Sequence, residues 1–191
     1  MPDFTIKPLS PATWDDFAAL VERHNGVWGG CWCLEFHAEG AERNNERRHK
    51  KQCRVNEGRA HAALVYAGDQ CIGWCQFGSP DELPRIKHQR AYRAGLEHAP
   101  DWRITCLFVD QAWRGQGVSA AAIEGALNEI ARLGGGMVES YPEDLAARTV
   151  SSSFHYNGSL STFEAQGFTR QRQLGKHHWV LVRQVPPAKP D

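Results

Sequence analysis

Apolar and polar residues alternate along this chain with two different periods, and each period predicts one type of element. Helical spacing and helix end signals predict helices over residues 10–25, 41–56, 117–133 and 159–166, the second of them rich in polar residues. Short apolar runs predict strands over residues 4–7, 62–66, 71–77, 102–109, 137–141 and 179–185, with another strand starting at Phe168. Ser10 is the expected N-cap of the first helix and Pro11 its first residue.

The order of these elements predicts how the strands pair. Gly68-Asp69 lies between two short apolar runs and predicts a β-hairpin. Residues 102–109 are typical of a strand buried on both faces, and the helix over 117–133 connects it to a parallel strand over 137–141. We therefore expect an α/β (α+β) fold with a mixed, mostly antiparallel central sheet flanked by helices. The polar connection over 79–98 is long enough to predict a functional loop or a short helix over a site.

Chain length and hydropathy limit the organisation of the protein. The chain has 191 residues, which predicts a single domain over residues 1–185 followed by a flexible C-terminal tail over residues 186–191. No run of 18 apolar residues occurs, so we expect no membrane span. The first residues lack the basic and apolar regions of a secretion signal. We expect a cytoplasmic protein.

Formal charge is zero overall, with 22 basic and 22 acidic residues. A dedicated nucleic-acid binder usually has a basic surplus, so we expect no nucleic-acid partner. Residues 42–59 are locally basic, with seven Lys or Arg and three Glu. This segment is either a solvated helix face or a rim that attracts anions, such as the phosphates of a cofactor.

Six cysteines are present, and we expect them to be reduced thiols. Cys31 and Cys33 are separated by one residue, whereas zinc sites usually use two to four and a second matching pair. We therefore expect no metal site, and the role of Cys31 and Cys33 stays open. Cys106, in the central strand, is expected to pack in the core, because a nucleophilic thiol would need a partner His.

The segment from Leu107 to Ser119 combines a buried strand, a glycine turn and the start of a helix. Such a turn directs several backbone N–H groups toward one point, where the helix dipole adds partial positive charge. Gly115 and Gly117 let the backbone approach a ligand closely. The segment therefore predicts an anion site suited to a pyrophosphate. A Walker A loop is excluded because no Lys follows, and a dinucleotide-binding domain would need more βαβ units than this chain has.

Arg114-Gly115-Gln116-Gly117-Val118-Ser119 resembles the cofactor motif Gln/Arg-x-x-Gly-x-Gly/Ala of the GNAT superfamily of acyl-CoA N-acetyltransferases, with Ser119 at the final small position. The strand before it ends in Leu107-Phe108-Val109, which matches the family's apolar-x-Val ending. Phe163 to Phe168 looks like the family's penultimate helix running into a Gly-Phe strand start. The order of elements over residues 4–185 also follows the family's plan.

The resemblance implies that acetyl-CoA is the cofactor, as a co-substrate, and that the strands over 102–109 and 137–141 splay apart to admit its thioester. Backbone groups of Leu107 to Val109 would bond the pantetheine arm, and a backbone N–H near Leu107 would stabilise the oxyanion. Backbone N–H groups from Gly115 to Ala120 would hold the pyrophosphate. The cofactor-binding residues expected on this basis are Leu107, Phe108, Val109, Arg114, Gly115, Gln116, Gly117, Val118, Ser119 and Ala120.

The resemblance leaves the catalytic acid open, because Phe163 occupies the position where many relatives have a proton-donating Tyr. Tyr156, Ser159 or a water molecule could replace it. Glu139 is the preferred general base, although strand alternation could instead turn it toward solvent. Weaker candidates for the base are Asp101, Glu35 and His37.

The expected function is transfer of an acetyl group from acetyl-CoA to a primary amine by direct attack in a ternary complex. The acceptor is a small molecule or a peptide, and a homodimer is an open alternative for the oligomeric state. Trp28, Trp32 and Phe36 either line the acceptor pocket or seal the core. The alternative functions are a catalytically impaired acyl-CoA-binding module of the same fold and a cysteine-based metal or redox protein.

Overall fold

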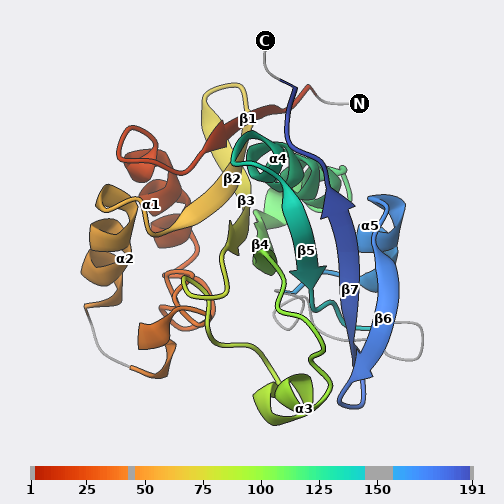
Figure 1. Ribbon diagram of the computed structural model, residues 1–191. Helices are drawn as coiled ribbons and strands as arrows, with labels where there is room; N and C mark the ends of the chain where they lie inside the picture. Colours follow the sequence, from red (N-terminus) through yellow and green to blue (C-terminus); the bar gives the residue numbers. More distant parts are fainter. Residues whose placement is uncertain (1–2, 43–45, 145–156, 190–191) are drawn as a thin grey trace.

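The computed structural model describes residues 3–42, 46–144 and 157–189 and contains one sheet of seven strands in the order β1-β2-β3-β4-β5-β7-β6 (Figure 1). The strands are β1 (Thr5–Pro8), β2 (His61–Ala67), β3 (Gln70–Gly78), β4 (Trp102–Val109), β5 (Gly136–Ser140), β6 (Thr169–Leu174) and β7 (His178–Val185). The helices are α1 (Trp14–Arg23), α2 (Arg47–Asn56), α3 (Gln89–Ala94), α4 (Val118–Arg132) and α5 (Leu160–Ala165), with short 3-10 turns η1 (Ala38–Ala41) and η2 (Gln111–Trp113).

Strand pairing confirms the predicted mixed sheet. β4 and β5 pair in parallel, and every other neighbouring pair among these strands is antiparallel. The predicted hairpin is formed by β2 and β3, which close at Ala67 and Gln70. The helix α4 connects β4 to β5, as expected from the alternation of apolar runs.

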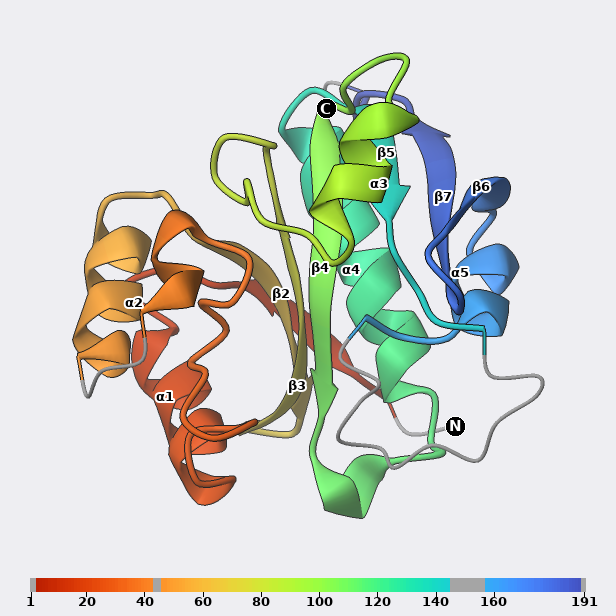
Figure 2. The same ribbon diagram turned by 90° about the horizontal axis from the view of Figure 1, so that it is seen from below.

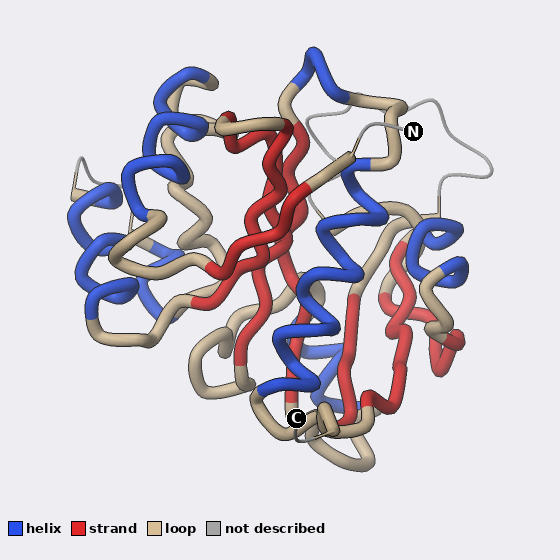
Figure 3. Tube along the Cα trace, turned by 90° about the horizontal axis from the view of Figure 1, so that it is seen from above, coloured by secondary structure: helices blue, strands red, loops and turns tan. Residues whose placement is uncertain are grey.

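Helices cover both faces of the sheet (Figure 2). α4 and α5 pack on one face, and α1 and α2 pack on the other face (Figures 2 and 3). The predicted inner stripe of α4 is buried at Ile123, Leu127 and Ile130. Gly125 lets this helix lie close to the sheet, because a Cβ there would lie 2.6 Å from Ile6 Cγ2. On the opposite face, α3 packs through Tyr92 against Tyr141.

Two predicted helix starts were wrong. α1 begins at Trp14, and its N-cap is Thr13 rather than Ser10. The Thr13 hydroxyl accepts a hydrogen bond from the Ser10 backbone N–H (2.9 Å) and donates to the Pro8 carbonyl (2.8 Å), which keeps the intervening residues in a turn. α2 begins at Arg47, six residues later than expected, after the 3-10 turn η1.

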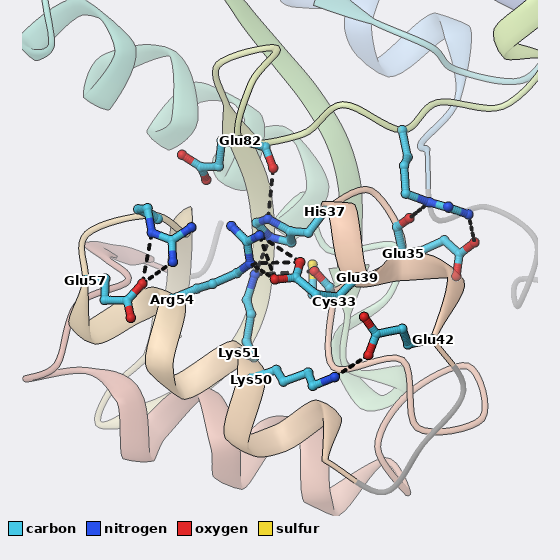
Figure 4. A network of polar contacts seen from close by, with 12 residues as sticks. Cys33, Glu35, His37, Glu39, Glu42, Lys50, Lys51, Arg54, Glu57 and Glu82 are labelled. Atoms are coloured by element: carbon cyan, nitrogen blue, oxygen red, sulfur yellow. Dashed lines mark hydrogen bonds and ion pairs between the residues drawn. The ribbon is translucent and has the colours of Figure 1, made fainter.

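The basic helix α2 is not simply a solvated face. Arg47, Lys51 and Arg54 are buried, while Arg48 is exposed. The buried cations of α2 reach into the loop that follows α1 (Figure 4). Their burial is possible because each guanidinium or ammonium donates hydrogen bonds to groups of that loop.

Two further expectations concern the chain ends and membranes. In the predicted tail, the Ala188 backbone N–H donates to the Ala131 carbonyl at the end of α4 (2.8 Å). Among the described residues, none of the helices has both the length and the apolar character that a membrane crossing needs.

Candidate functional site

The predicted glycine turn forms the start of α4. Gly115 and Gly117 have positive φ angles of 75° and 88°, and a Cβ at either residue would meet nothing within 4 Å. Gly117 is the N-cap of α4 and has no side chain to cap the helix. The first backbone N–H that bonds within the helix is that of Ala121, to the Gly117 carbonyl (3.1 Å). The N–H groups of residues 118–120 therefore point out of the helix end, as an anion site requires.

A cavity of about 300 Å³ lies at this helix end. Its lining residues are Val109, Trp113, Arg114, Gly115, Gly117, Val118, Ser119, Ala120 and Thr162. The structure thus brings together most of the predicted cofactor-binding residues. Gln116 instead turns its amide back to the Ala112 carbonyl (3.1 Å). Leu107 and Phe108 bury their side chains in the cores on opposite faces of the sheet, so only their backbone can face a ligand.

The strands β4 and β5 separate early, near the start of β4, and the rest of β4 leads to this turn. Their parallel ladder contains only the pairs Trp102–Val138, Arg103–Glu139 and Ile104–Ser140. β4 continues to Val109, so within the described residues its last five residues have no β5 partner. The predicted splay therefore begins immediately after Ile104. It leaves backbone N–H and C=O groups of residues 105–109 on that edge for another partner.

A β-bulge at Thr105 lies where the splay begins. On the β3 side, Gln76 pairs with Cys106 and Phe77 pairs with Ile104, which leaves Thr105 without a partner residue in the ladder. The buried Gln76 amide donates to the Thr105 hydroxyl (3.1 Å). Bulges redirect backbone groups and often lie beside active sites. This bulge changes the direction of the backbone N–H groups just before Leu107.

A buried network that includes Cys33, His37 and Lys51 (Figure 4) fixes the Gln76 side chain. The Gln76 carbonyl oxygen accepts hydrogen bonds from the Lys51 ammonium and from the Cys33 thiol, both at 2.9 Å. Lys51 also contacts His37 Nε2 (3.1 Å) and the Cys33 carbonyl (3.3 Å). Burial lowers the pKa of Lys51 and, together with the nearby positive charges, lowers the pKa of His37. His37 thus lies inside this network, with its Nδ1 3.0 Å from the Glu82 carbonyl oxygen.

Glu139, the predicted base, is buried and does not face solvent. Its Oε2 accepts hydrogen bonds from the Tyr92 hydroxyl (2.6 Å) and the Tyr141 hydroxyl (2.9 Å). Arg103 donates from Nη2 to the Tyr92 oxygen (3.3 Å) and from Nη1 to the Leu83 carbonyl (2.7 Å). Burial raises the pKa of both tyrosines, and the hydrogen bond to Glu139 adds to this effect at Tyr92. Glu139 lies one residue before the last β4–β5 pair.

The predicted acids have different surroundings. Phe163 is buried and packs edge-on against Phe168, with ring centroids 5.2 Å apart. Ser159 is the N-cap of α5, and its hydroxyl accepts from the Thr162 backbone N–H (3.3 Å). Tyr156 lies outside the described residues.

The weaker candidates are engaged elsewhere. Glu35 lies near the guanidinium groups of Arg47 and Arg85 (both 3.8 Å), and Asp101 accepts from the Met137 backbone N–H (2.7 Å). Burial and the neighbouring Cys33 raise the pKa of the Cys106 thiol well above its ordinary value, which agrees with core packing.

The aromatic segment after α1 belongs mostly to the core. Trp32 and Phe36 are buried, and Trp32 stacks on Trp14 with ring centroids 6.2 Å apart. Trp28 is partly buried and packs edge-on against Phe108 of β4 (5.7 Å). Of the three predicted pocket aromatics, Trp28 alone retains a partly exposed side chain next to β4.

The sequence did not point to Tyr92 or Arg103 as partners of Glu139. Tyr92 lies in the polar connection before β4, 47 residues from Glu139 in the chain. Two signals were available. Arg103 is a cation inside an otherwise apolar strand and so requires buried partners, and Tyr141 follows Glu139 by two residues, a spacing that places both on one strand face.

Among known protein families, the model of the acetyltransferase (GNAT) family matches residues 17–149 of this chain. None of the curated proteins matches the sequence. Similar solved structures include an acetyltransferase from Thermus thermophilus, with 16% identity, 95% of this chain and 96% of that chain covered, and a TM-score of 0.51.

Two other similar structures carry more specific names. The ribosomal-protein-S18-alanine N-acetyltransferase from Escherichia coli has 12% identity, with 98% of this chain and 97% of that chain covered and a TM-score of 0.51. NAA60 of Arabidopsis thaliana, in complex with acetyl-CoA, has 13% identity, with 96% of this chain and 100% of that chain covered and a TM-score of 0.50. These likenesses establish the fold. Because the family model covers most of the chain, the protein belongs to the GNAT family of acetyltransferases, which uses acetyl-CoA.

Proposed function

We propose that this protein transfers the acetyl group of acetyl-CoA to a primary amine by direct attack in a ternary complex. The observation that carries the proposal is the combination of the open helix end at Gly117 with the early separation of β4 and β5. An anion site and a free strand edge, joined by one turn, match the two ends of an acyl-CoA pantetheine arm. Family membership supports the same chemistry.

The α4 end holds the pyrophosphate in this proposal. The N–H groups of residues 118–120 donate to its oxygens, and the dipole of the 15-residue helix adds partial positive charge. Arg114 lines the same cavity and contributes a full positive charge. The side chains of Val118, Ser119 and Ala120 are small enough to leave the backbone accessible.

The free edge of β4 binds the pantetheine arm through the backbone of Leu107, Phe108 and Val109. The bulge at Thr105 directs a backbone N–H near Leu107 toward the thioester carbonyl. There it stabilises the negative charge that develops on the oxygen when the amine attacks. The N–C bond forms, the C–S bond breaks, and the sulfur takes up a proton.

Glu139 accepts the proton that the amine loses. Its carboxylate and the two tyrosines that donate to Oε2, Tyr92 and Tyr141, are all buried, so the amine has to enter the protein to reach a tyrosine hydroxyl, through which the proton passes to Glu139. In this relay a tyrosine oxygen takes the amine proton while its own proton moves to Glu139. For the sulfur, we propose Tyr156 as proton donor, because Phe163 has no proton to give.

The experiment follows free thiol release from acetyl-CoA across primary amines, with the acetylated product identified by mass. The panel contains ethanolamine, spermidine, free lysine and a peptide with a free N-terminus. We expect Glu139→Gln to slow turnover while acetyl-CoA still raises the melting temperature. Glu129→Gln, at a partly exposed carboxylate of α4 that pairs with Arg132, is the matched control. Unchanged turnover in Glu139→Gln would remove this residue from the mechanism.

A second candidate function is binding of acyl-CoA without catalysis, and Phe163 in place of a proton-donating Tyr favours it. This alternative predicts that acetyl-CoA stabilises the protein but that no amine releases thiol above the rate without protein. The two measurements therefore separate the candidates.

A further inference from the structure

The basic residues of this chain are unevenly distributed in space. Residues 85–98 and 169–178 together carry seven Lys or Arg and one acidic residue, Glu97. The whole chain has 22 of each kind, so the remainder carries 15 basic and 21 acidic residues. The zero net charge thus conceals a strongly basic region against an acidic remainder.

The two basic segments lie side by side (Figure 1). The rings of His88 and His178 have centroids 5.6 Å apart. Arg172 of β6 donates to the Tyr92 carbonyl of α3 (3.4 Å), and its guanidinium lies 5.2 Å from the centre of the Tyr92 ring. Burial and then the positive charges of Lys87, His88 and His177 lower the pKa of His178 to about 4. The α3 region and the β6–β7 turn therefore form one surface, here called the basic rim.

Four cations of the basic rim lack carboxylate partners. Within the described residues, Arg90, Arg93, Arg172 and Lys176 form no ion pair, and Arg90, Arg93 and Lys176 are exposed. At the two ends of the rim, Arg85 is paired with Glu35 and Arg170 with Glu164.

The other basic segment, α2, differs in this respect. Apart from the buried Lys51, its cations are paired with carboxylates: Arg48 lies 3.0 Å from Glu22. Arg54 lies 2.7 Å from Glu39 (Figure 4). Lys50 lies against Glu42 and Glu46. Of the two alternatives for residues 42–59, the anion-attracting rim therefore gains no support from the structure, because the carboxylates near α2 offset most of its charge. At the basic rim, Arg90, Arg93, Arg172 and Lys176 keep their charge unpaired within the described residues, while Glu143 and Asp144 border the rim at His178 and His177.

The basic rim is far from the expected phosphate site. α3 contacts the start of the eight-residue strand β4, through Tyr92 and Arg103, whereas the glycine turn follows its end. At about 3.3 Å per residue, these ends are roughly 23 Å apart. The rim therefore does not serve the pyrophosphate. It borders Glu139, where the acceptor amine is deprotonated in the proposed function.

We propose that the acceptor carries negative charge close to its amine and that the basic rim recognises this charge. The inference rests on the proposed acetyl transfer. Uncompensated cations beside a site raise the local concentration of anionic ligands and favour them over cationic ones. Phosphate and carboxylate groups share this chemistry.

The test compares acceptors that differ in charge alone. O-phosphoethanolamine is paired with ethanolamine, and a peptide with three glutamates after its N-terminal alanine is paired with the same peptide containing three glutamines or three lysines. We expect kcat/KM to be at least about tenfold higher for an anionic member, and the advantage to shrink as salt rises from low to high. The two pairs distinguish a phosphate from acidic residues as the source.

A charge-reversal variant tests whether the preference for anionic acceptors arises at the basic rim. Arg90→Glu, Arg93→Glu and Lys176→Glu are combined, and the control with the same change in net charge combines Arg48→Glu, Arg59→Glu and Arg132→Glu. The rim variant should lose most of the anionic preference, and the control should keep it. Far-UV circular dichroism and the melting shift with acetyl-CoA verify that both variants are folded and bind the cofactor.

Each outcome has a definite meaning. Equal rates for anionic and neutral acceptors, faster acetylation of the lysine peptide, or equal losses in both variants would overturn the proposal while leaving acetyl transfer intact. If no acceptor is acetylated, the proposed function fails. Binding of the glutamate peptide, measured by fluorescence anisotropy, then tests separately whether the basic rim recognises negative charge. If the unaltered protein binds this peptide and the rim variant does not, recognition of negative charge by the basic rim is supported. If the unaltered protein does not bind it, this recognition is overturned.

Discussion

The most informative perturbation of this fold is Tyr92→Phe, because one hydroxyl connects two buried charges. The Tyr92 hydroxyl donates to Glu139 (2.6 Å) and accepts from Arg103 (3.3 Å). The phenylalanine ring keeps the packing of α3 against Tyr141 and removes only the oxygen. Glu139 then retains its bond from Tyr141, and Arg103 retains its bond to Leu83.

Hydrogen bonds to charged groups contribute about 1.5–3 kcal/mol each. Two such bonds are lost, and the remaining partners compensate in part, so we expect the free energy of unfolding to fall by about 2–4 kcal/mol. Urea denaturation measures this, with the slope of the transition unchanged. The control is Tyr66→Phe, whose hydroxyl makes one bond, to the Asp16 carboxylate (2.8 Å); because Asp16 is only partly buried and screened by solvent, the loss should be smaller, about 0.5–1.5 kcal/mol. A loss below that of the control would show that Tyr92 does not connect the two charges.

Two further predictions concern buried polar groups. The pKa of His178 is lowered from 6.5 to about 4, so the unfolded chain takes up a proton below pH 6.5 before the native chain does, and stability falls as pH drops toward 4. Urea unfolding of His178→Gln should show a flatter pH dependence in that window, and an unchanged slope would contradict the neutral state of His178. Thr105→Val leaves the buried Gln76 amide without its acceptor and should cost about 1–3 kcal/mol in urea unfolding, whereas no loss would mean that this hydrogen bond does not hold the bulge.

Sequence reasoning succeeded where the chemistry is local. The glycine turn and the start of α4 could be predicted because positive φ angles and a helix N-terminus depend on a few adjacent residues. The alternation of apolar runs also gave β4, α4 and β5 in their order. The same local logic failed at Ser10, because the contacts of Thr13 with Pro8 and Ser10 hold residues 10–13 in a turn, so that the helix begins only at Trp14.

Contacts between distant segments could not be predicted in this way. Lys51 and Gln76 are 25 residues apart, and only the packing of α2 on β3 brings them together. The position of Tyr92 over Glu139 depends on how the connection before β4 folds back on the sheet. Similarly, the contrast between α2, whose charge is mostly offset, and the basic rim, whose four cations are unpaired within the described residues, depends on which carboxylates lie nearby in space, which the count of charges does not reveal.

Thermal denaturation with and without acetyl-CoA, on the unaltered protein and on Gly117→Trp, tests the central claim most directly. Gly117 has a φ of 88° at the open helix end, where an indole would fill the cavity and strain the turn. We predict that acetyl-CoA at millimolar concentration raises the melting temperature of the unaltered protein and that the shift is abolished in Gly117→Trp. No shift in the unaltered protein, or an equal shift in both, would contradict the assignment of the glycine turn as the acetyl-CoA site.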